Sequence, residues 1–258
     1  MMTYERREAI LEQLKKKPTA TVEQLAALFY VSEATIRCDL SLLSDEGLIK
    51  RTYGGAVLLE GRGNDAPLLM RETQNAQTKG MIATQALQFI KDGSAIMLDS
   101  SSTVGALARK LGGFNGITAI TNGIKTAASL SENPGTRVLC TGGSVRENSM
   151  SLVGQHACNF IERFNADVLF FSCRGLSAVT GITESSDEET LIKRRMFEAA
   201  SKKILLLTSN KLDKTYLSHL CRVDELDALI CDRAPEGELA QVLSLARVQV
   251  VVTGGADS

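Results

Sequence analysis

A loop rich in hydroxyl side chains is the first feature of this sequence that could do chemistry. It begins at Asp99, directly after the apolar run Ser94–Leu98, and leads into a predicted helix at Thr103–Lys110. The free N–H groups and the dipole at the start of a helix favour an anion, so the loop indicates a phosphate site. A second interpretation stays open, in which the serines only cap the helix. The candidate ligands are Asp99, Ser100, Ser101, Ser102 and Thr103.

Further loops carry glycine or polar side chains directly after apolar runs. A Gly-Gly pair after a strand is usually only a turn, and no G-x-G-x-x-G fingerprint has an acidic residue about 20 positions later, so we predict no dinucleotide site and no cofactor. Together with the hydroxyl loop, these loops favour a site for a small polar ligand, because ligands of open parallel sheets bind where the strands end. Their residues are Thr121, Asn122, Gly123, Gly142, Gly143, Arg146, Cys173, Arg174 and Gly175.

The sequence offers little for metal or covalent chemistry. Its six cysteines lack C-x-x-C spacing, and its two histidines have no Cys, Asp or Glu at metal-ligand spacing. We therefore predict reduced thiols and no metal site. A run of carboxylates, Glu184 and Asp187–Glu189, precedes a helix with Lys193 and is typical of a solvated helix start that matches the dipole. Catalysis would require one of these carboxylates to be buried facing Asp99. A sugar-phosphate isomerase-like enzyme is therefore the alternative for this part of the chain.

The segments that position these loops are short, apolar and separated by helical stretches. Apolar runs without alternation are typical of strands buried on both faces, and the intervening helices indicate parallel pairing. We therefore predict a doubly wound, mostly parallel α/β domain. The predicted strands are Ser94–Leu98, Ile117–Thr121, Arg137–Cys140, Val168–Ser172, Ile204–Thr208, Ala228–Cys231 and Val248–Val252.

The N-terminal part of the chain has a different, mainly helical pattern. Apolar residues at three-to-four spacing predict three helices, and residues 48–57, around Gly54 and Gly55, predict a hairpin. Three helices and a hairpin make a winged helix-turn-helix. The predicted helices are Tyr4–Lys16, Glu23–Phe29 with Thr21 as N-cap, and Ser32–Gly47 with Ser32 as N-cap.

A winged helix-turn-helix presents its last helix to the major groove of DNA. The start of that helix has small and polar side chains and Arg37, whose guanidinium can hold a phosphate or a guanine edge. Because the net charge is −1, DNA affinity must come from such a local patch. A protein-docking module is the alternative. We predict contacts with double-stranded operator DNA from Ser32, Glu33, Ala34, Thr35, Arg37, Lys50, Arg51, Tyr53 and Gly54.

A segment with the composition of a linker separates the two parts. Gly61, Gly63 and Pro67 interrupt any periodicity there. The 258 residues are therefore predicted to comprise a DNA-binding domain at 1–58, a linker at 59–74 and an effector-binding domain at 75–258. No signal peptide and no apolar run of about 18 residues is present, so we expect a cytoplasmic protein without a membrane partner.

The predicted winged helix resembles a known family. The segment V-S-E-A-T-I-R-C-D-L at 31–40 and the segment R-T-Y-G-G-A at 51–56 are similar to the N-terminal signature of the DeoR family of bacterial regulators of sugar metabolism. That family usually has V-S-x-x-T-I-R-R-D-L and R-x-H-G-G-A, so Cys38 replaces an arginine and Tyr53 replaces a histidine. Losing one arginine removes about one phosphate contact, so weaker and less salt-dependent DNA binding is expected.

Motifs in the rest of the chain extend this resemblance to the DeoR C-terminal sensor domain, which is similar to ribose-5-phosphate isomerase. The resemblance implies that Ser100–Thr103 takes a phosphate and that Lys211 and Arg146 face a sugar, and we predict Lys193 as a further effector ligand. Ser101 departs from the usual glycine, and Thr208 departs from an aspartate that would accept sugar hydroxyls. The matching motifs are Leu98–Thr103, Thr121-Asn122, Gly142-Gly143, Leu152–Gly154, Asp167, Gly175, Gly181–Thr183, Lys193 and Ser209–Lys211.

The resemblance implies a repressor of a sugar-utilisation operon that a phosphorylated sugar releases from its operator. The operator and the sugar would each favour one arrangement of the two domains, so the sugar acts through its differential affinity for them. A homodimer or homotetramer is expected, because one winged helix offers little contact area and dimers read paired half-sites.

Overall fold

The computed structural model describes residues 3–45, 49–58 and 67–254, and the chain divides into two units, residues 1–70 and 71–258. The division falls inside the predicted linker, 59–74. Residues 59–66 of this linker lie outside the described residues, and its later part contains the short helix α4 (Leu68–Thr73). The composition did not indicate this helix. It begins after Pro67, whose fixed φ suits the start of a helix, and Leu68 is buried.

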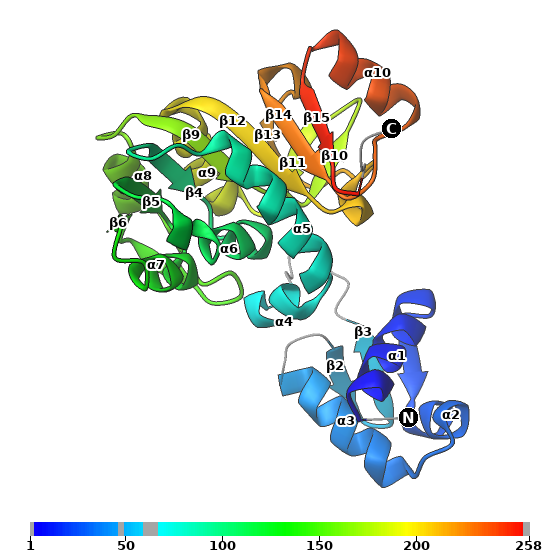
Figure 1. Ribbon diagram of the computed structural model, residues 1–258. Helices are drawn as coiled ribbons and strands as arrows, with labels where there is room; N and C mark the ends of the chain where they lie inside the picture. The colour runs from blue at the N-terminus through cyan, green and yellow to red at the C-terminus, as the bar shows by residue number, and fades with distance from the viewer. Residues whose placement is uncertain (1–2, 46–48, 59–66, 255–258) are drawn as a thin grey trace. The chain divides into compact units, whose positions relative to one another are not determined.

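Three helices and a three-stranded antiparallel sheet form the first unit (Figure 1). The three helices are those that the sequence predicts. Thr21 and Gln24 form a capping box at the start of α2, and the Oγ of Ser32 caps α3 by accepting a hydrogen bond from Thr35 N at 3.2 Å. The elements are α1 (Thr3–Lys16), β1 (Thr19–Thr21), α2 (Val22–Phe29), α3 (Glu33–Asp45), β2 (Ile49–Thr52) and β3 (Gly55–Leu58).

The sheet of the first unit has the strand order β1-β3-β2. The predicted hairpin is therefore confirmed, and β1 adds a third strand that the sequence did not indicate, because it has only three residues and its partner lies far along the chain. Helices and sheet share an apolar core that includes Ile10, Leu25 and Ile36. Arg6 of α1 and Asp39 of α3 form a buried ion pair at 2.6 Å, which fixes the third helix against the first.

A seven-stranded sheet forms the centre of the second unit, with the order β15-β14-β12-β9-β4-β5-β6. Every neighbouring pair in it is parallel. The seven strands are the seven that the sequence predicts. They are β4 (Ala95–Leu98), β5 (Ile117–Thr121), β6 (Thr136–Cys140), β9 (Ala166–Phe171), β12 (Ala200–Leu207), β14 (Ala228–Cys231) and β15 (Gln249–Val252).

The direction of winding reverses between β4 and β9. The chain runs from β4 through β5 to β6, returns to β9 on the other side of β4, and continues outward through β12 and β14 to β15. Ligands of open α/β sheets bind at such a reversal, beyond the carboxyl ends of the strands. The candidate site therefore lies after β4 and β9.

Helices cover both faces of this sheet (Figure 1). Ile96 and Leu98 enter one apolar core with side chains of α5, α6 and α7, and Met97 enters a second core with side chains of α8, α9 and α10. The doubly wound, mostly parallel α/β fold is thus confirmed. The helices are α5 (Ala76–Ala86), α6 (Ser102–Ala108), α7 (Ile124–Ser131), α8 (Gln155–Ile161), α9 (Asp187–Glu198) and α10 (Gly237–Leu245).

Two small antiparallel sheets at the ends of the main strands were not predicted. One is the hairpin of β7 (Ser144–Arg146) and β8 (Ser151–Val153), and the other has the order β10-β11-β13. Their strands have three or four residues, too few for a clear period, and β13 pairs with a strand far away in the sequence. The latter strands are β10 (Gly175–Ser177), β11 (Gly181–Glu184) and β13 (Ser218–Cys221).

Candidate functional site

Asp99 lies at the reversal of the sheet, directly after β4, and its side chain is fully buried. Its Oδ1 accepts a hydrogen bond from the N–H of Ser101 at 2.9 Å, and its Oδ2 accepts one from the N–H of Ser172 at 3.0 Å. Ser172 is the residue after β9. The Asp99 carboxylate therefore joins the exits of the two strands that flank the reversal and holds the hydroxyl loop against the end of β9.

Lys193, on α9, is buried beside the same two exits. Its Nζ lies 3.1 Å from Oδ2 of Asp99 and donates to the carbonyl of Ser172 at 2.7 Å and to Oε1 of Glu184. Burial opposes the charge, but the carboxylates of Glu184 and Asp99 raise the pKa of Lys193 above its ordinary value. Three acceptors thus match the three N–H donors of the ammonium. A bond from Lys193 to an effector would have to replace one of them.

Glu184 partly meets the condition stated above for a catalytic carboxylate, because it is buried and shares the Lys193 ammonium with Asp99. The other acidic residues of the run do not. Asp187 and Glu188 are exposed, and the buried Glu189 accepts a hydrogen bond from the hydroxyl of Ser151. The structure therefore contains a closed ion-pair cluster rather than a pair of carboxylates facing each other.

Lys211 reaches the end of β9 from the short 3-10 turn Ser209–Lys211 that follows β12. Its Nζ donates to the carbonyl of Cys173 at 2.7 Å and to the hydroxyl of Ser172 at 3.1 Å. Among the described residues, no ion pair joins it to a carboxylate. Burial lowers the pKa of Lys211 to about 8. The predicted effector ligand Lys211 therefore lies at the reversal with hydrogen bonds to neutral oxygens and, among the described residues, without an ion pair to a carboxylate.

Lys79, on α5, is a second such cation, and sequence reasoning missed it. It is 6% exposed, and its Nζ donates to the main-chain carbonyls of Arg71 and Gln74. Burial, followed by the positive charges of Lys211, Arg71 and others, lowers the pKa of Lys79 to about 8. A lysine on the buried face of a helix ahead of the first central strand was the signal that could have found it.

The hydroxyl loop supports both of its interpretations in part. Ser101 is the N-cap of α6, since its Oγ accepts a hydrogen bond from Val104 N at 3.3 Å. Ser100, Ser102 and Thr103 are buried, and Thr103 Oγ1 has no hydrogen-bond partner. Buried hydroxyls without a partner are rare and costly. The cap is thus structural, and Thr103 is available to a ligand.

The exits of β5 and β4 lie side by side. A Cβ on Gly123 would come within 2.9 Å of the Cα of Ser100, so only glycine permits this approach. Thr121 Oγ1 accepts a hydrogen bond from the N–H of Gly123. Asn122 is fully buried and donates from Nδ2 to the carbonyl of Leu152, while its Oδ1 has no partner. Asn122 therefore offers a second unsatisfied polar atom.

The remaining predicted glycines have a structural role. A Cβ on Gly143 would lie 2.5 Å from the carbonyl oxygen of Val153, and one on Gly175 would lie 2.2 Å from that of Lys214. Gly142, beside Gly143, has a φ of 68°, which favours glycine. Gly143 and Gly175 thus permit close packing of the loops after β6 and β9, whereas Gly142 permits a left-handed backbone.

Arg146, at the end of β7, lies against α9. Its guanidinium nitrogens are 3.7 Å from Oε1 of Glu189 and 3.8 Å from Oε2 of Glu188. The structure therefore places this predicted sugar-facing residue among carboxylates of the helix that carries Lys193.

The turn that carries Lys211 is held by a carboxylate from another strand. Asp232, the residue after β14, accepts hydrogen bonds from the N–H of Ser209 at 2.6 Å and from its hydroxyl at 2.7 Å. Thr208 is buried and donates to Oδ1 of Asn210 at 2.6 Å. An aspartate at the end of a predicted central strand was the signal for Asp232, which sequence reasoning also missed.

In the first unit, the predicted DNA-contacting residues form an exposed set at the start of α3 and on the β2–β3 hairpin. Glu33 and Arg37 form an exposed ion pair at 3.1 Å, and Arg51 donates to the hydroxyl of Ser41 at 2.7 Å. Tyr53, at the hairpin turn, is fully exposed. The side chain of Lys50 lies outside the described residues. Also exposed or partly exposed are Ser32, Ala34, Thr35 and Gly54.

Both units match models of one protein family. Residues 6–62 match the DeoR-like helix-turn-helix domain, and residues 74–233 match the DeoR C terminal sensor domain. The chain belongs to the DeoR family. It is a DNA-binding transcriptional regulator whose sensor domain takes a small-molecule effector.

Similar proteins agree with this DeoR-family assignment along nearly the whole chain. The HTH-type transcriptional regulator GolR of Listeria innocua is 37% identical over 90% of this chain and 91% of its own length. The HTH-type transcriptional repressor GlcR of Bacillus subtilis is 32% identical over 98% of this chain and 97% of its own length. These relatives are transcriptional regulators rather than enzymes, so the enzyme alternative is not supported.

Among solved structures, the sensor domain of this DeoR-family regulator is similar to ribose 5-phosphate isomerase A from Methanocaldococcus jannaschii. The match has a TM-score of 0.40 and 16% identity, and it covers 54% of this chain and 55% of the isomerase. A likeness this weak carries no argument about the site.

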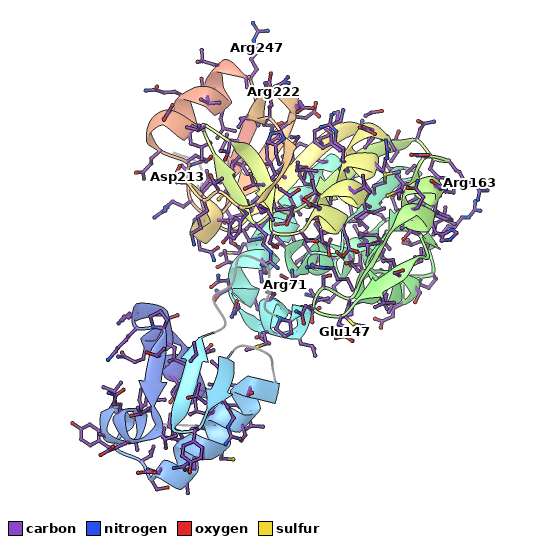
Figure 2. The ribbon with its side chains drawn as sticks, turned by 180° about the vertical axis from the view of Figure 1, so that it is seen from behind. Arg71, Glu147, Arg163, Asp213, Arg222 and Arg247 are labelled. Atoms are coloured by element: carbon purple, nitrogen blue, oxygen red, sulfur yellow. The ribbon has the colours of Figure 1, made fainter. Side chains whose placement is uncertain are left out.

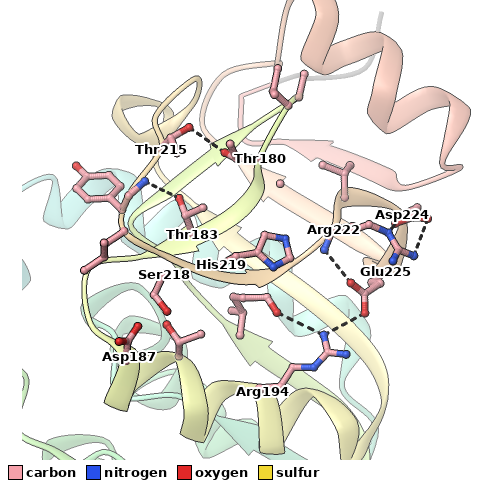
Figure 3. A pocket seen from close by; sticks show the side chains of 18 of the residues that line it. Thr180, Thr183, Asp187, Arg194, Thr215, Ser218, His219, Arg222, Asp224 and Glu225 are labelled. Atoms are coloured by element: carbon pink, nitrogen blue, oxygen red, sulfur yellow. Dashed lines mark hydrogen bonds and ion pairs between the residues drawn. The ribbon is translucent and has the colours of Figure 1, made fainter.

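A cavity of about 1110 Å³ lies elsewhere in the sensor domain of the DeoR-family regulator, between the β10-β11-β13 sheet, α9 and the turn Val223–Glu225 (Figure 3). None of the predicted effector ligands lines it. Two of its arginines, Arg194 and Arg222, are paired with Glu225 and Asp224 at 3.1 and 2.9 Å. We therefore assign no ligand to this cavity.

The described part of this DeoR-family chain has neither a candidate metal site nor a candidate membrane-spanning helix. No group of His, Cys, Asp and Glu side chains there has a geometry suited to a metal ion. Likewise, no helix within 3–45, 49–58 or 67–254 is both long and apolar enough to span a membrane.

Proposed function

We propose that this DeoR-family regulator is a cytoplasmic repressor of a carbohydrate-utilisation operon and leaves its operator when a phosphorylated sugar binds beyond β4 and β9. One observation carries the proposal. The buried Lys79 and the partly buried Lys211 have oxygen partners from carbonyls and a hydroxyl, but no carboxylate partner among the described residues. A phosphate group supplies the missing negative charge through charge-assisted hydrogen bonds.

The surrounding residues divide into ligands and positioning residues in this proposal. Lys79 and Lys211 bind the phosphate with the N–H groups of the hydroxyl loop, and Thr103 Oγ1 and Asn122 Oδ1, which lack partners, bind polar groups of the ligand. Lys193 does not touch the ligand. It holds Asp99 and Glu184 and so sets the position of the loop.

The direction of regulation is supported by the relatives, of which several are named repressors. In the same proposal, the exposed residues at the start of α3 and on the hairpin bind operator DNA. A homodimer or homotetramer reads paired half-sites, because one winged helix offers little contact area.

The effector is tested by thermal unfolding of the full chain with a panel of phosphorylated sugars and the matching free sugars. A ligand that binds only the folded state at 100 times its Kd stabilises it by about 2.7 kcal/mol. We expect a saturable rise in Tm with one phosphorylated sugar and none with its free sugar. Equal shifts with both forms, or no shift with any, would contradict the phosphate site.

Lys211→Met is the test of the site itself. Losing one charge-assisted hydrogen bond is worth about 1.5–3 kcal/mol, so we expect affinity for the phosphorylated sugar to fall about tenfold to 100-fold while operator binding is kept. Lys202→Met is the matched control, because Lys202 is exposed on β12. Unchanged affinity in Lys211→Met would remove this residue from the site.

DNA contact is tested with an operator selected from random duplexes by the wild-type protein. Arg37→Ala is expected to weaken operator binding by about 1–3 kcal/mol if Arg37 reads a base, or to reduce the salt dependence by about one counterion if it holds a phosphate. Arg163→Ala, an exposed arginine of the sensor domain (Figure 2), is the control. Unchanged affinity in Arg37→Ala would move the reading surface elsewhere.

A further inference from the structure

The helix α4 lies in the chain between the predicted linker residues 59–66 and the proposed effector site. It has six residues, and isolated helices shorter than about 12 residues are marginal in water. Its stability therefore depends on contacts with the rest of the sensor domain. Those contacts involve the effector site directly.

Lys79 of the proposed effector site also caps α4. Its ammonium donates to the carbonyl of Arg71, in the last turn of α4, and to that of Gln74 at 2.8 Å, just after the helix. The last carbonyls of a helix have no partner within the helix and carry its negative dipole end. The Lys79 ammonium therefore satisfies carbonyls that would otherwise be left without a donor.

Side chains of α4 reach three segments that follow strand exits. Glu72 forms ion pairs with Lys125 of α7 and, at 3.8 Å, with Arg109 at the end of α6. Arg71 donates to the carbonyl of Asn148, between β7 and β8, at 3.4 Å. Figure 2 labels Arg71 and Glu147, the neighbour of Asn148, on the same side of the domain. The position of α4 is thus tied to the loops around the site.

The effector and α4 need the same ammonium. Burial and the positive charges of Lys211 and Arg71 lower the pKa of Lys79, and the Glu72 carboxylate opposes them only in part. The present partners of Lys79 are neutral carbonyls, whereas a phosphate adds the attraction between opposite charges to the hydrogen bond. A phosphate that reaches Lys79 therefore outcompetes the carbonyls of Arg71 and Gln74.

We propose that α4 is the element on which the effector acts: a bound phosphate draws the Lys79 ammonium away from the carbonyls at the end of α4 and releases that end. The inference rests on the proposed function, because it needs an anion at Lys79. Because α4 follows the linker residues 59–66, its release frees the point where the linker joins the sensor domain. The effector then has different affinities for the arrangements of the chain in which α4 is attached and released.

The variant Glu72→Gln tests whether α4 competes with phosphate for Lys79 or only supports the site. The substitution weakens the attachment of α4 and changes none of the effector ligands, although it also removes a carboxylate that raises the pKa of Lys79. Coupling is reciprocal. If phosphate and the attached α4 compete, loosening α4 tightens phosphate binding. We expect Kd for inorganic phosphate to fall about threefold in Glu72→Gln, whereas a helix that only supports the site would make it rise.

The experiment measures hydrogen exchange and melting of the full chain with inorganic phosphate as the probe, against chloride at equal ionic strength. In the wild type, phosphate is expected to raise Tm and to speed exchange of amides 70–75 at least about threefold. In Glu72→Gln, these amides exchange fast before phosphate is added. Glu225→Gln is the control, because the Glu225 carboxylate also forms an ion pair with an arginine, Arg194, and has a similar exposed fraction, 24% against 19% for Glu72. This control is expected to change neither the affinity for phosphate nor the exchange of amides 70–75.

The outcomes separate this inference from the proposed function. A rise in Tm without faster exchange at 70–75 would overturn the role of α4 and leave the effector site standing. Weaker phosphate binding in Glu72→Gln would also overturn it. No rise in Tm with phosphate would overturn the anion site and this inference together.

Discussion

Asp99, Lys193 and Glu184 form one buried charge cluster, in which each residue depends on the others. Removing one partner of a buried pair leaves an uncompensated charge, which costs more than the pair contributes when it is intact. The single residues of the sensor site therefore differ in kind: the cluster positions the loop, whereas Lys79 and Lys211 carry charge that a ligand can neutralise.

Asp99→Asn tests the positioning role at the scale of one residue. It removes a charge that faces Lys193 and replaces one of the two oxygens that accept main-chain N–H bonds with an NH2 donor. We expect the sensor domain to lose about 3 kcal/mol of unfolding free energy, measured by urea denaturation. Asp187→Asn, at an exposed position of α9, is expected to cost less than about 1 kcal/mol. Equal losses in the two variants would contradict the positioning role.

The two lysines make effector binding depend on pH. Each has a pKa of about 8 without ligand, and a bound phosphate favours the charged form, so binding takes up protons. Affinity is then fully present below about pH 7 and falls as pH rises through 8. Phosphate esters are dianions over this range, because their second pKa is about 6. Titration calorimetry at pH 7 and 9 is expected to show affinity about tenfold lower at pH 9 for each lysine that must be protonated. Constant affinity would show that neither lysine binds as an ammonium.

At the scale of elements, the buried ion pair of Arg6 and Asp39 joins α3 to α1 beside their shared apolar core. Asp39→Asn leaves Arg6 without its charged partner, so we expect the winged helix to lose about 3 kcal/mol and DNA affinity to fall with it. The measurement is far-UV circular dichroism during denaturation. The transition of the winged helix is expected to shift relative to the wild type, whereas the transition of the sensor domain is expected to stay unchanged. Arg6→Met with Asp39→Leu removes both charges and is expected to recover most of the stability.

At the scale of the whole molecule, the proposed function links the effector and the operator through the equilibrium between arrangements of the chain. If the phosphorylated sugar weakens operator affinity by a given factor, the operator must weaken affinity for the sugar by the same factor. The check is to measure sugar affinity with and without saturating operator duplex. Unequal factors would show that another species, such as a different oligomer, takes part.

Much of the architecture could be predicted from local sequence. The inner strands of the central sheet are mostly buried and contain apolar runs, whereas the edge strands β6 and β15 are partly exposed; the helices of the first unit have clear spacing, and α2 has a clear cap. The strand exits that form the site followed directly from the ends of those runs. The segments that were missed, β1, α4 and the short antiparallel strands, have six residues or fewer, too few for a clear period. In addition, β1 and β13 pair with strands far away in the chain.

The sequence by itself determined the order of the elements, the family and the strand exits of the candidate site, because apolar periodicity and motifs are local properties of the chain. Only the tertiary structure decided which charges are satisfied. Lys193 received three acceptors from three segments, whereas Lys79 and Lys211 received no carboxylate among the described residues. Whether a buried charge has a partner depends on distances between residues that are remote in sequence, and those distances exist only in the folded chain.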